Sequence, residues 1–349
     1  MLPHLILISI LVFFSLPQNN KYRIPIDKQI IVIILWLFSG FRYFVGKDFG
    51  TYKIIFENPN HVGNLSLEPV WINIANFFRN NHLSSQAWFL FTSFIIIYLI
   101  CFGIRKLSIN FYLSVVLFVV GWFYFESMNV VRQYVAISIL FATFYLFLEK
   151  KYLLYIIAIF IAFQFHKSAI IMLPIIFLAK IKYPKWLMIS AVIITFFTGD
   201  KLMLLILDFI LELSGTLLGS YASYTLEKVR QMTTVNTGLL RVFYNLIAIG
   251  ILFLSEKINK KHIYNYIYIN LVVFSVLIYN VFMYVQPVMR LSWYMFIFII
   301  VLIPYILKCF TLQSRLLIIT VIVLVFCSFT IKNFTLEHYI YNFNFNLIN

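Results

Sequence analysis

Charged residues are scarce in this chain. Asp, Glu, Lys and Arg make up only 11% of its 349 residues, whereas 63% are hydrophobic and the mean hydropathy is +0.95. A water-soluble domain of this length needs more polar surface, so the composition excludes that class. Cysteine is also rare: Cys101, Cys309 and Cys327 have no paired spacing, which indicates neither a disulfide framework nor a metal site. With only 11 glycines and no internal repeat, the chain also lacks the Gly-broken, repeated halves typical of secondary transporters.

Apolar runs of about 15–20 residues recur along the whole chain, and each is long enough to cross ~30 Å of hydrocarbon as a helix. They predict an all-α, polytopic integral membrane protein with about 12 transmembrane helices in a single domain, residues 1–349. The first run lacks a basic n-region and a cleavage site, so we expect a retained span. The predicted spans are residues 2–17, 29–46, 87–104, 107–125, 130–149, 152–165, 168–180, 186–200, 237–255, 263–284, 291–308 and 316–331.

Lysine and arginine are distributed unevenly over the loops between these spans. One alternate set of loops holds 15 of the 27 basic residues and three acids, and it includes Lys21, Arg23, Lys150, Lys182 and Lys185. Basic loops stay in the cytoplasm, so the opposite loops and both termini are predicted to lie outside. The formal charge of +15 is therefore mainly a topology signal and requires no nucleic-acid partner.

Two long segments are predicted on the outer face, residues 42–86 and 201–236, and both are expected to contain interfacial helices. In the first, Pro69 suits the first turn of a short helix. In the second, Gly215 and Gly219 are expected to end a helix that begins near Leu202. Six of the outer basic residues are arginines, and arginine binds phosphate oxygens in a bidentate manner. The outer face is therefore the predicted working face.

The candidate anion-binding residues are arginines at the predicted outer ends of spans. Arg132 shares one predicted helix face with Asn129 and Gln133, because the three are spaced i, i+3 and i+4. Arg290 opens a later span, and Arg42 lies in an aromatic loop that also contains Tyr52. The alternative for each arginine is anchoring to lipid headgroups.

Three residues compete for the role of general base, namely Asp48, Glu68 and His166. Each is a titratable group on the predicted outer face. Glu68 precedes Pro69 and is equally suited to capping the helix, and a histidine in a short turn is often structural. The residues alone do not choose among the three.

These motifs occur in an order that resembles the EpsG family of bacterial membrane proteins, which belongs with the Wzy-type polysaccharide polymerases. The residues that carry the resemblance span about residues 40 to 295: Arg42, Gly46, Asp48, Tyr52, Glu68-Pro69, Asn129, Arg132-Gln133, Phe165-His166, Ser168, Arg290 and Tyr294. The chain departs from the family pattern at Lys47 and Phe49, where a small hydroxyl residue and a tyrosine are usual.

The resemblance implies a glycosyltransferase of the bacterial cytoplasmic membrane with an extracytoplasmic site. Its substrate would be an oligosaccharide repeat unit on undecaprenyl diphosphate, polymerised into capsule, exopolysaccharide or O-antigen. Membrane lipids, a chain-length regulator and a flippase are the implied partners, and neither cofactor nor metal is implied. Within this hypothesis Arg132 and Arg290, with Arg42 as a third candidate, bind the diphosphate, while Asn129, Gln133 and Tyr52 orient groups. The alternatives are a flippase for the same lipid-linked glycan and a membrane acyltransferase that modifies glycans.

Overall fold

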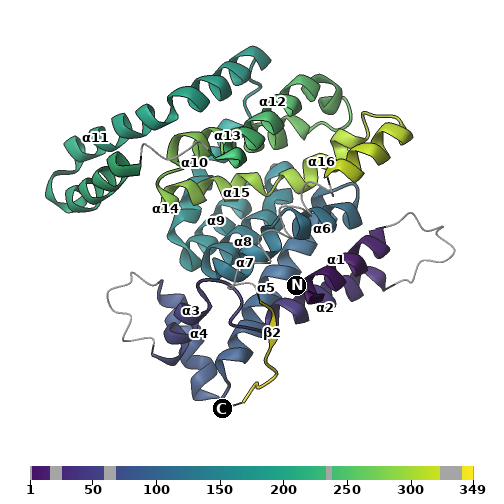
Figure 1. Cartoon of the computed structure of the whole chain (residues 1–349), viewed down its shortest axis with the longest axis vertical. Coiled ribbons are helices and arrows are strands. Elements are labelled where there is room, and N and C mark those ends of the chain that lie inside the picture. The colour runs from purple at the N-terminus through teal and green to yellow at the C-terminus, as the bar shows by residue number, and fades with distance from the viewer. Residues whose placement is uncertain (1, 16–25, 59–67, 233–237, 323–339, 349) are drawn as a thin grey trace. The chain divides into compact units, whose positions relative to one another are not determined.

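The computed structural model describes residues 2–15, 26–58, 68–232, 238–322 and 340–348, without side chains at 15, 207 and 210–232. Helices dominate this part of the chain (Figure 1), which confirms the prediction of an all-α protein. The chain forms two compact units, Met1–Ile170 with Phe310–Asn349, and Ile171–Cys309. Lys21, Arg23 and Cys327, together with residues 323–331 of the last predicted span, lie outside the described residues.

The first unit contains the aromatic loop and all three candidate base residues. Its described elements are α1 (Leu2–Ser15), α2 (Asp27–Gly40), β1 (Arg42–Tyr43), α3 (Phe49–Glu57), α4 (Pro69–Asn80), α5 (Ser85–Leu107), α6 (Phe111–Val120), α7 (Phe123–Asn129), α8 (Val131–Leu148), α9 (Tyr152–Phe165), the 3-10 helix η2 (Lys167–Ile171) and β2 (Asn342–Phe343).

Helix α8 forms the centre of this unit because it packs against both α5 and α9. Ser84 caps α5, since its side-chain oxygen accepts hydrogen bonds from the backbone N–H groups of Gln86 and Ala87. Gly103 on α5 faces Phe141 on α8, and a Cβ at this glycine would overlap the Phe141 ring. This close packing positions the first turn of α8, where Arg132 lies.

The last described residues of the chain return to the aromatic loop. β2 pairs antiparallel with β1, with Arg42 opposite Phe343, and the Asn344 N–H donates to the Phe41 carbonyl at 2.9 Å. At the start of the chain, the His4 and Tyr341 ring centroids lie 5.3 Å apart. Both ends of the described chain therefore lie beside residues 41–44. This arrangement is compatible with the predicted topology, in which both termini and Arg42 lie on one side of the membrane, and that topology stays a prediction.

The segment between α6 and α8 is broken twice. α6 and α7 are bent by 54°, at Trp122, which has a positive φ of 72°. α7 then ends at Asn129, and Val130 separates it from α8. The prediction that Asn129, Arg132 and Gln133 share one helix face is wrong, because the chain leaves helical geometry between the first and the second of them.

The second unit is arranged around α13, which contacts every other described helix of the unit. α11 covers the whole of Lys185–Met232, so Gly215 and Gly219 lie within the helix and do not end it as predicted. The elements of the unit are α10 (Met172–Ala179), α11, α12 (Leu239–Asn259), α13 (Asn265–Phe282), α14 (Gln286–Met289), the 3-10 helix η3 (Arg290–Ser292), α15 (Trp293–Phe296) and α16 (Ile299–Leu307).

Five described helices are long and apolar enough to cross a membrane, or up to seven if each bent pair counts as one span. The five are Ser85–Leu107, Val131–Leu148, Lys185–Ile206, Leu239–Asn259 and Asn265–Phe282. Four shorter apolar helices, Leu2–Phe14, Tyr152–Phe165, Lys167–Ala179 and Leu312–Ile322, fall within or overlap other predicted spans. The structure thus supports a polytopic membrane protein, while the number of 12 spans stays a prediction.

Candidate functional site

Glu68 lies immediately before α4, where its main chain begins the helix. Its backbone is extended, Pro69 occupies the first turn, and the Trp71 N–H donates to the Glu68 carbonyl at 3.0 Å. The Glu68 side chain makes no capping hydrogen bond with α4. The capping alternative therefore does not account for the carboxylate, which turns to residues far away in the sequence.

Arg132 is the first of these distant partners. Its Nη1 donates to Glu68 Oε2 at 2.8 Å, and the two residues are 64 positions apart. The Glu68 side chain is 5% exposed and the Arg132 side chain 25% exposed, so the carboxylate is buried behind the cation. Arg132 Nε is also buried and has no hydrogen-bond partner among the described residues. One nitrogen of the guanidinium is therefore held firmly by Glu68, while the side chain stays partly exposed.

His166 is the second partner of the Glu68 carboxylate. Its Nδ1 lies 3.1 Å from Glu68 Oε1, which also accepts a 3.3 Å hydrogen bond from the Lys167 backbone N–H. His166 ends α9, and its side chain is 26% exposed. We call Glu68, Arg132 and His166 the Glu68 cluster.

A buried tryptophan, Trp71, holds together the two helix ends that carry Glu68 and His166. Trp71 lies in the first turn of α4, and its Nε1 donates to the Phe165 carbonyl at 2.8 Å. The two rings also contact each other edge to face, with centroids 5.7 Å apart. This contact ties the start of α4 to the end of α9, which places Glu68 next to His166.

The electrostatics of the cluster keep Glu68 ionised. Burial alone would raise the pKa of the carboxyl group, but the hydrogen bond from His166 and the positive charge of Arg132 outweigh it and lower the pKa to about 2. An ionised carboxylate is only an acceptor, so His166 Nδ1 must carry the shared proton. In the neutral ring, Nε2 then holds the free lone pair.

The loop around Asp48 packs beside the first turn of α8. Asn129 Oδ1 accepts a 3.1 Å hydrogen bond from the Asp48 backbone N–H, and Asn129 Nδ2 donates to Glu126 Oε1 at 3.3 Å. The Arg132 backbone N–H points at the Tyr52 hydroxyl at 3.5 Å, a long contact. Burial raises the pKa of this hydroxyl although Arg132 lowers it, so Tyr52 is protonated at neutral pH.

Four of the predicted binding residues are buried, namely Tyr52 (5% exposed), Asn129 (7% exposed), Arg42 and Gln133. Arg42 is 1% exposed and donates to the Ser39 carbonyl at 2.7 Å, to Ser93 Oγ at 3.0 Å and to the Met128 carbonyl at 3.3 Å. Gln133 is also 1% exposed. The structure thus places the Arg42 and Gln133 side chains inside the helical packing of the first unit, and neither presents itself to a ligand at the surface as Arg132 does.

Arg290 belongs to the second unit, so its position relative to the Glu68 cluster is not described. It begins η3 and is half-buried, and its guanidinium lies 5.8 Å from the centroid of the Trp293 ring. The prediction that Arg290 and Arg132 act on one anion therefore stays a prediction.

Arg241, which is not among the arginines singled out from the sequence, organises a buried polar network in the second unit. Arg241 is 1% exposed, and its Nη2 donates to the carbonyls of Thr195, Phe196 and Asn280 at 3.2, 2.6 and 3.4 Å. Asn245 and Asn280 exchange two side-chain hydrogen bonds of 2.8 Å. We call Arg241, Asn245, Asn280, Thr195 and Asp200 the Arg241 network. The available signal was several polar residues within apolar segments.

The Glu68 cluster combines features that suit an acid-base reaction on an anionic substrate. It presents a cation, a histidine with an oriented ring, and the N-terminal turn of α8, which carries a partial positive charge. Glu68 is a poor base because its proton affinity is low, whereas His166 is held in place by it. The structure therefore places two of the three competing base candidates, Glu68 and His166, in direct contact.

The family model of the EpsG family matches residues 28–348, a range that includes the Glu68 cluster, Arg241 and Arg290. No curated protein and no solved structure matches the chain.

Proposed function

Because the chain belongs to the EpsG family, whose members are Wzy-like polymerases, we propose that it joins lipid-linked oligosaccharide repeat units by glycosyl transfer. The substrate is an oligosaccharide on undecaprenyl diphosphate, and the reaction takes place at the outer face of the bacterial cytoplasmic membrane. The product is a capsule, exopolysaccharide or O-antigen polymer. The observation that carries this proposal is the Glu68 cluster, in which Arg132 is 25% exposed and His166 is oriented by a buried carboxylate.

In this proposal Arg132 binds the diphosphate of the donor substrate. Negative charge grows on the diphosphate as it leaves, and a prearranged cation stabilises that charge without reorganising. Arg132 is prearranged because Glu68 holds Nη1 at 2.8 Å, while 25% of the Arg132 side chain stays exposed. Each hydrogen bond to a charged group contributes about 1.5–3 kcal/mol. Arginine can supply this stabilisation itself, so the proposed mechanism needs no metal.

His166 is the general base of the proposed reaction. With Nδ1–H directed at Glu68, the neutral ring presents Nε2 to the hydroxyl group of the acceptor sugar. Glu68 is then a positioning residue that selects the tautomer and stabilises the imidazolium once it forms. Asp48 lies on the neighbouring loop and contacts Asn129 through its backbone, so we assign it no proton transfer.

The proposed reaction is a single glycosyl transfer in which one bond forms, one bond breaks and one proton moves. The acceptor hydroxyl oxygen forms a bond to the anomeric carbon, and its proton moves to His166 Nε2. The bond between the anomeric carbon and the diphosphate oxygen breaks, and its electron pair stays on the leaving lipid diphosphate beside Arg132. Release of the proton from His166 returns the enzyme to its starting state.

The other predicted residues take supporting roles in this proposal. Arg290, in the second unit, is proposed as a second diphosphate contact. Asn129 and Tyr52 hold the Asp48 loop and the start of α8. Arg42 and Gln133 are buried, and we assign them to the packing of that region.

Reconstitution tests the proposal directly. The full chain is placed in proteoliposomes with undecaprenyl-diphosphate-linked repeat units, and glycan length and glycan translocation are both measured. The proposal predicts elongation and release of lipid diphosphate. Translocation without elongation would support the flippase alternative, and transfer of an acyl group to the glycan would support the acyltransferase.

A matched pair of variants links the activity to the cluster. Arg132→Lys keeps the charge but loses the planar fork, so elongation should fall sharply while the amount of folded protein is unchanged. Arg79→Lys is the control, because Arg79 is exposed on the last turn of α4. Equal elongation by both variants would remove Arg132 from the proposed site.

A further inference from the structure

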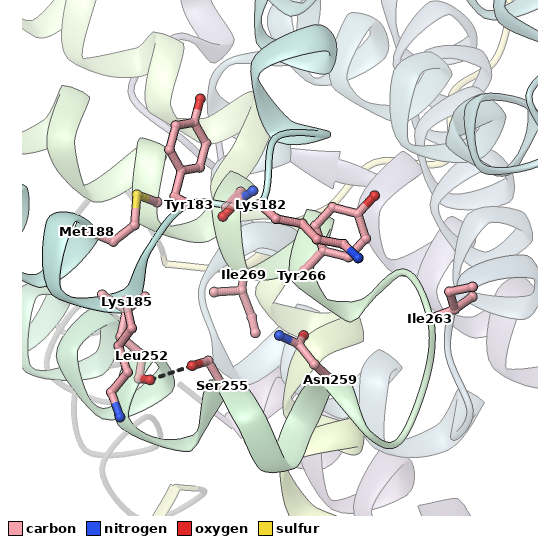
Figure 2. A pocket seen from close by; sticks show the side chains of 11 residues that line it. Lys182, Tyr183, Lys185, Met188, Leu252, Ser255, Asn259, Ile263, Tyr266 and Ile269 are labelled. Atoms are coloured by element: carbon pink, nitrogen blue, oxygen red, sulfur yellow. Dashed lines mark hydrogen bonds between the residues drawn. The ribbon is translucent and has the colours of Figure 1, made fainter.

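A second candidate site lies in the second unit, far along the chain from the Glu68 cluster. It is a cavity of 330 Å³ between the segment that joins α10 to α11, the end of α12 and the start of α13. Figure 2 shows Lys185, Asn259 and Tyr266 arranged around it. No step of the proposed polymerase reaction uses these residues.

Positive charge borders this cavity. Lys182 and Lys185 both line it, and two helices begin there, α11 at Lys185 and α13 at Asn265. Lys182 Nζ lies 5.5 Å from the centroid of the Tyr266 ring. One carboxylate is near: Glu256 Oε1 lies 3.9 Å from Lys185 Nζ, but Glu256 is 82% exposed and so holds the lysine only loosely. The border therefore favours an anion.

The floor of the cavity is rigid. Asn270 is buried, and its Nδ2 donates to the carbonyls of Ala179 and Ile181 at 2.9 and 2.8 Å. Tyr183 packs edge to face against Phe274, with centroids 5.8 Å apart. These contacts fix the segment that carries Lys182, so the site exists before a ligand arrives.

The remaining walls of the cavity are apolar and continue onto an exposed hydrophobic surface of the protein. Met188, Leu252, Ile263 and Ile269 line the cavity beside the polar groups. Exposed large hydrophobic side chains next to it in the sequence include Trp186 (69%), Phe253 (63%) and Ile263 itself (74%). A ligand that fits both parts has a negatively charged head and an apolar tail.

We propose that this cavity, which we call the lysine pocket, binds the phosphate of an anionic membrane phospholipid, with Lys182 and Lys185 at the phosphate and the apolar wall along the first part of an acyl chain. Basic pockets between membrane helices recognise such headgroups, and lysine contacts phosphate as a compact point charge. The basic loops 180–185 and 257–261 are predicted to be cytoplasmic, so the lipid belongs to the inner leaflet.

Native mass spectrometry of the purified full chain tests the lysine pocket. The protein is titrated with phosphatidylglycerol, with phosphatidylcholine and with soluble glycerol 3-phosphate. The double variant Lys182→Gln/Lys185→Gln should bind phosphatidylglycerol roughly ten- to thirtyfold more weakly, because each lysine near the membrane surface strengthens the binding of an anionic lipid by about fivefold. Lys260→Gln/Lys261→Gln removes two exposed lysines of the same basic face that do not line the cavity, and it should change binding less than twofold.

Three further results decide the assignment. Lys182→Arg/Lys185→Arg keeps both charges and should retain phosphatidylglycerol, which separates loss of charge from loss of fold. Equal binding of phosphatidylcholine by the unmodified chain would overturn the proposal, since the pocket would then not select for net negative charge. Displacement of the lipid by glycerol 3-phosphate at the lipid's own concentration would also overturn it, because the apolar wall would contribute nothing.

Discussion

Two arginines, one in each unit, are paired with a carboxylate in opposite ways. In the first unit Glu68 is 5% exposed and Arg132 is 25% exposed, so the acid is buried and the cation faces outward. In the second unit Arg241 is 1% exposed and Asp200 is 37% exposed, so the cation is buried and the acid faces outward. The same two charges thus present different groups to a ligand.

The remaining contacts of the two arginines also differ between the buried Arg241 and the partly exposed Arg132. Arg241 Nη2 lies within hydrogen-bonding distance of three backbone carbonyls, and Gly199 of α11 packs so closely on Asn280 that a Cβ there would overlap the Asn280 carbonyl. Arg132, by contrast, makes one strong side-chain contact, to Glu68. Arg241 therefore joins α11, α12 and α13, whereas Arg132 is partly exposed, as the anion-binding role that we propose for it requires.

The largest expected effect is on catalysis, at His166. His166→Asn removes the proposed base, and elongation should fall by about 10²- to 10⁴-fold because general base catalysis contributes that much. His82→Asn is the matched control, since His82 is exposed and lies outside the Glu68 cluster. Initial rates with the reconstituted protein measure both variants, and a His166→Asn enzyme as fast as the control would exclude His166 as the base.

The next effect is on stability, at Arg241. Arg241→Met leaves the carbonyls of α11 and α13 without their donor and should lower the free energy of unfolding by about 3–5 kcal/mol. Lys201→Met removes an exposed charge from α11 and should change it by less than ~0.5 kcal/mol. Thermal unfolding in detergent compares them. If the Arg241→Met protein were fully stable but no longer elongated glycans, Arg241 would have a role in the reaction and not the structural role given to it here.

Much of the helical framework was predictable from the sequence, because apolar run length is a local property. The predicted helix at 152–165 matches α9, that at 130–149 matches α8 within a residue at each end, and Pro69 begins α4 as expected. The break at Val130 and the bend at Trp122 were missed, since both follow from how α6, α7 and α8 pack and not from hydropathy.

The residues of the candidate site were predictable from the sequence, but the contacts among them were not. Glu68, Arg132 and His166 stood out individually as polar residues near the ends of apolar runs. Their contacts join positions 64 and 98 residues apart, which no local pattern contains. The burial of Arg42 and Arg241 was missed for the same reason, because an arginine near the end of a span has the same sequence pattern whether it reaches water or a neighbouring helix.

A smaller effect is expected at Glu68 and depends on pH. The pKa of the folded carboxyl group is lowered from 4.5 to about 2, so its stabilisation is complete above pH 4.5 and is lost as the pH falls toward 2. Glu68→Gln should therefore unfold more easily than the unmodified protein at neutral pH, by about 1.5–3 kcal/mol, and the difference should shrink in acid. Unfolding curves at several pH values measure it. A difference that is the same at every pH would show that the charge of Glu68 contributes nothing.

The smallest effect is expected at Asp48. Asp48→Asn keeps the backbone N–H that donates to Asn129 Oδ1, so the loop should hold its position and elongation should fall less than about tenfold. Measuring Asp48→Asn and His166→Asn in the same assay decides which of the two residues is the better candidate for the base. If Asp48→Asn lost as much activity as His166→Asn, Asp48 would replace His166 as the proposed base.

Binding of undecaprenyl diphosphate to the purified chain measures whether Arg132 holds the diphosphate of the lipid substrate. Titration of the purified chain should show that Arg132→Lys binds the diphosphate about tenfold or more weakly than the unmodified protein, while Arg79→Lys binds it equally well. Binding that is unchanged in Arg132→Lys, with both proteins folded, would contradict the account.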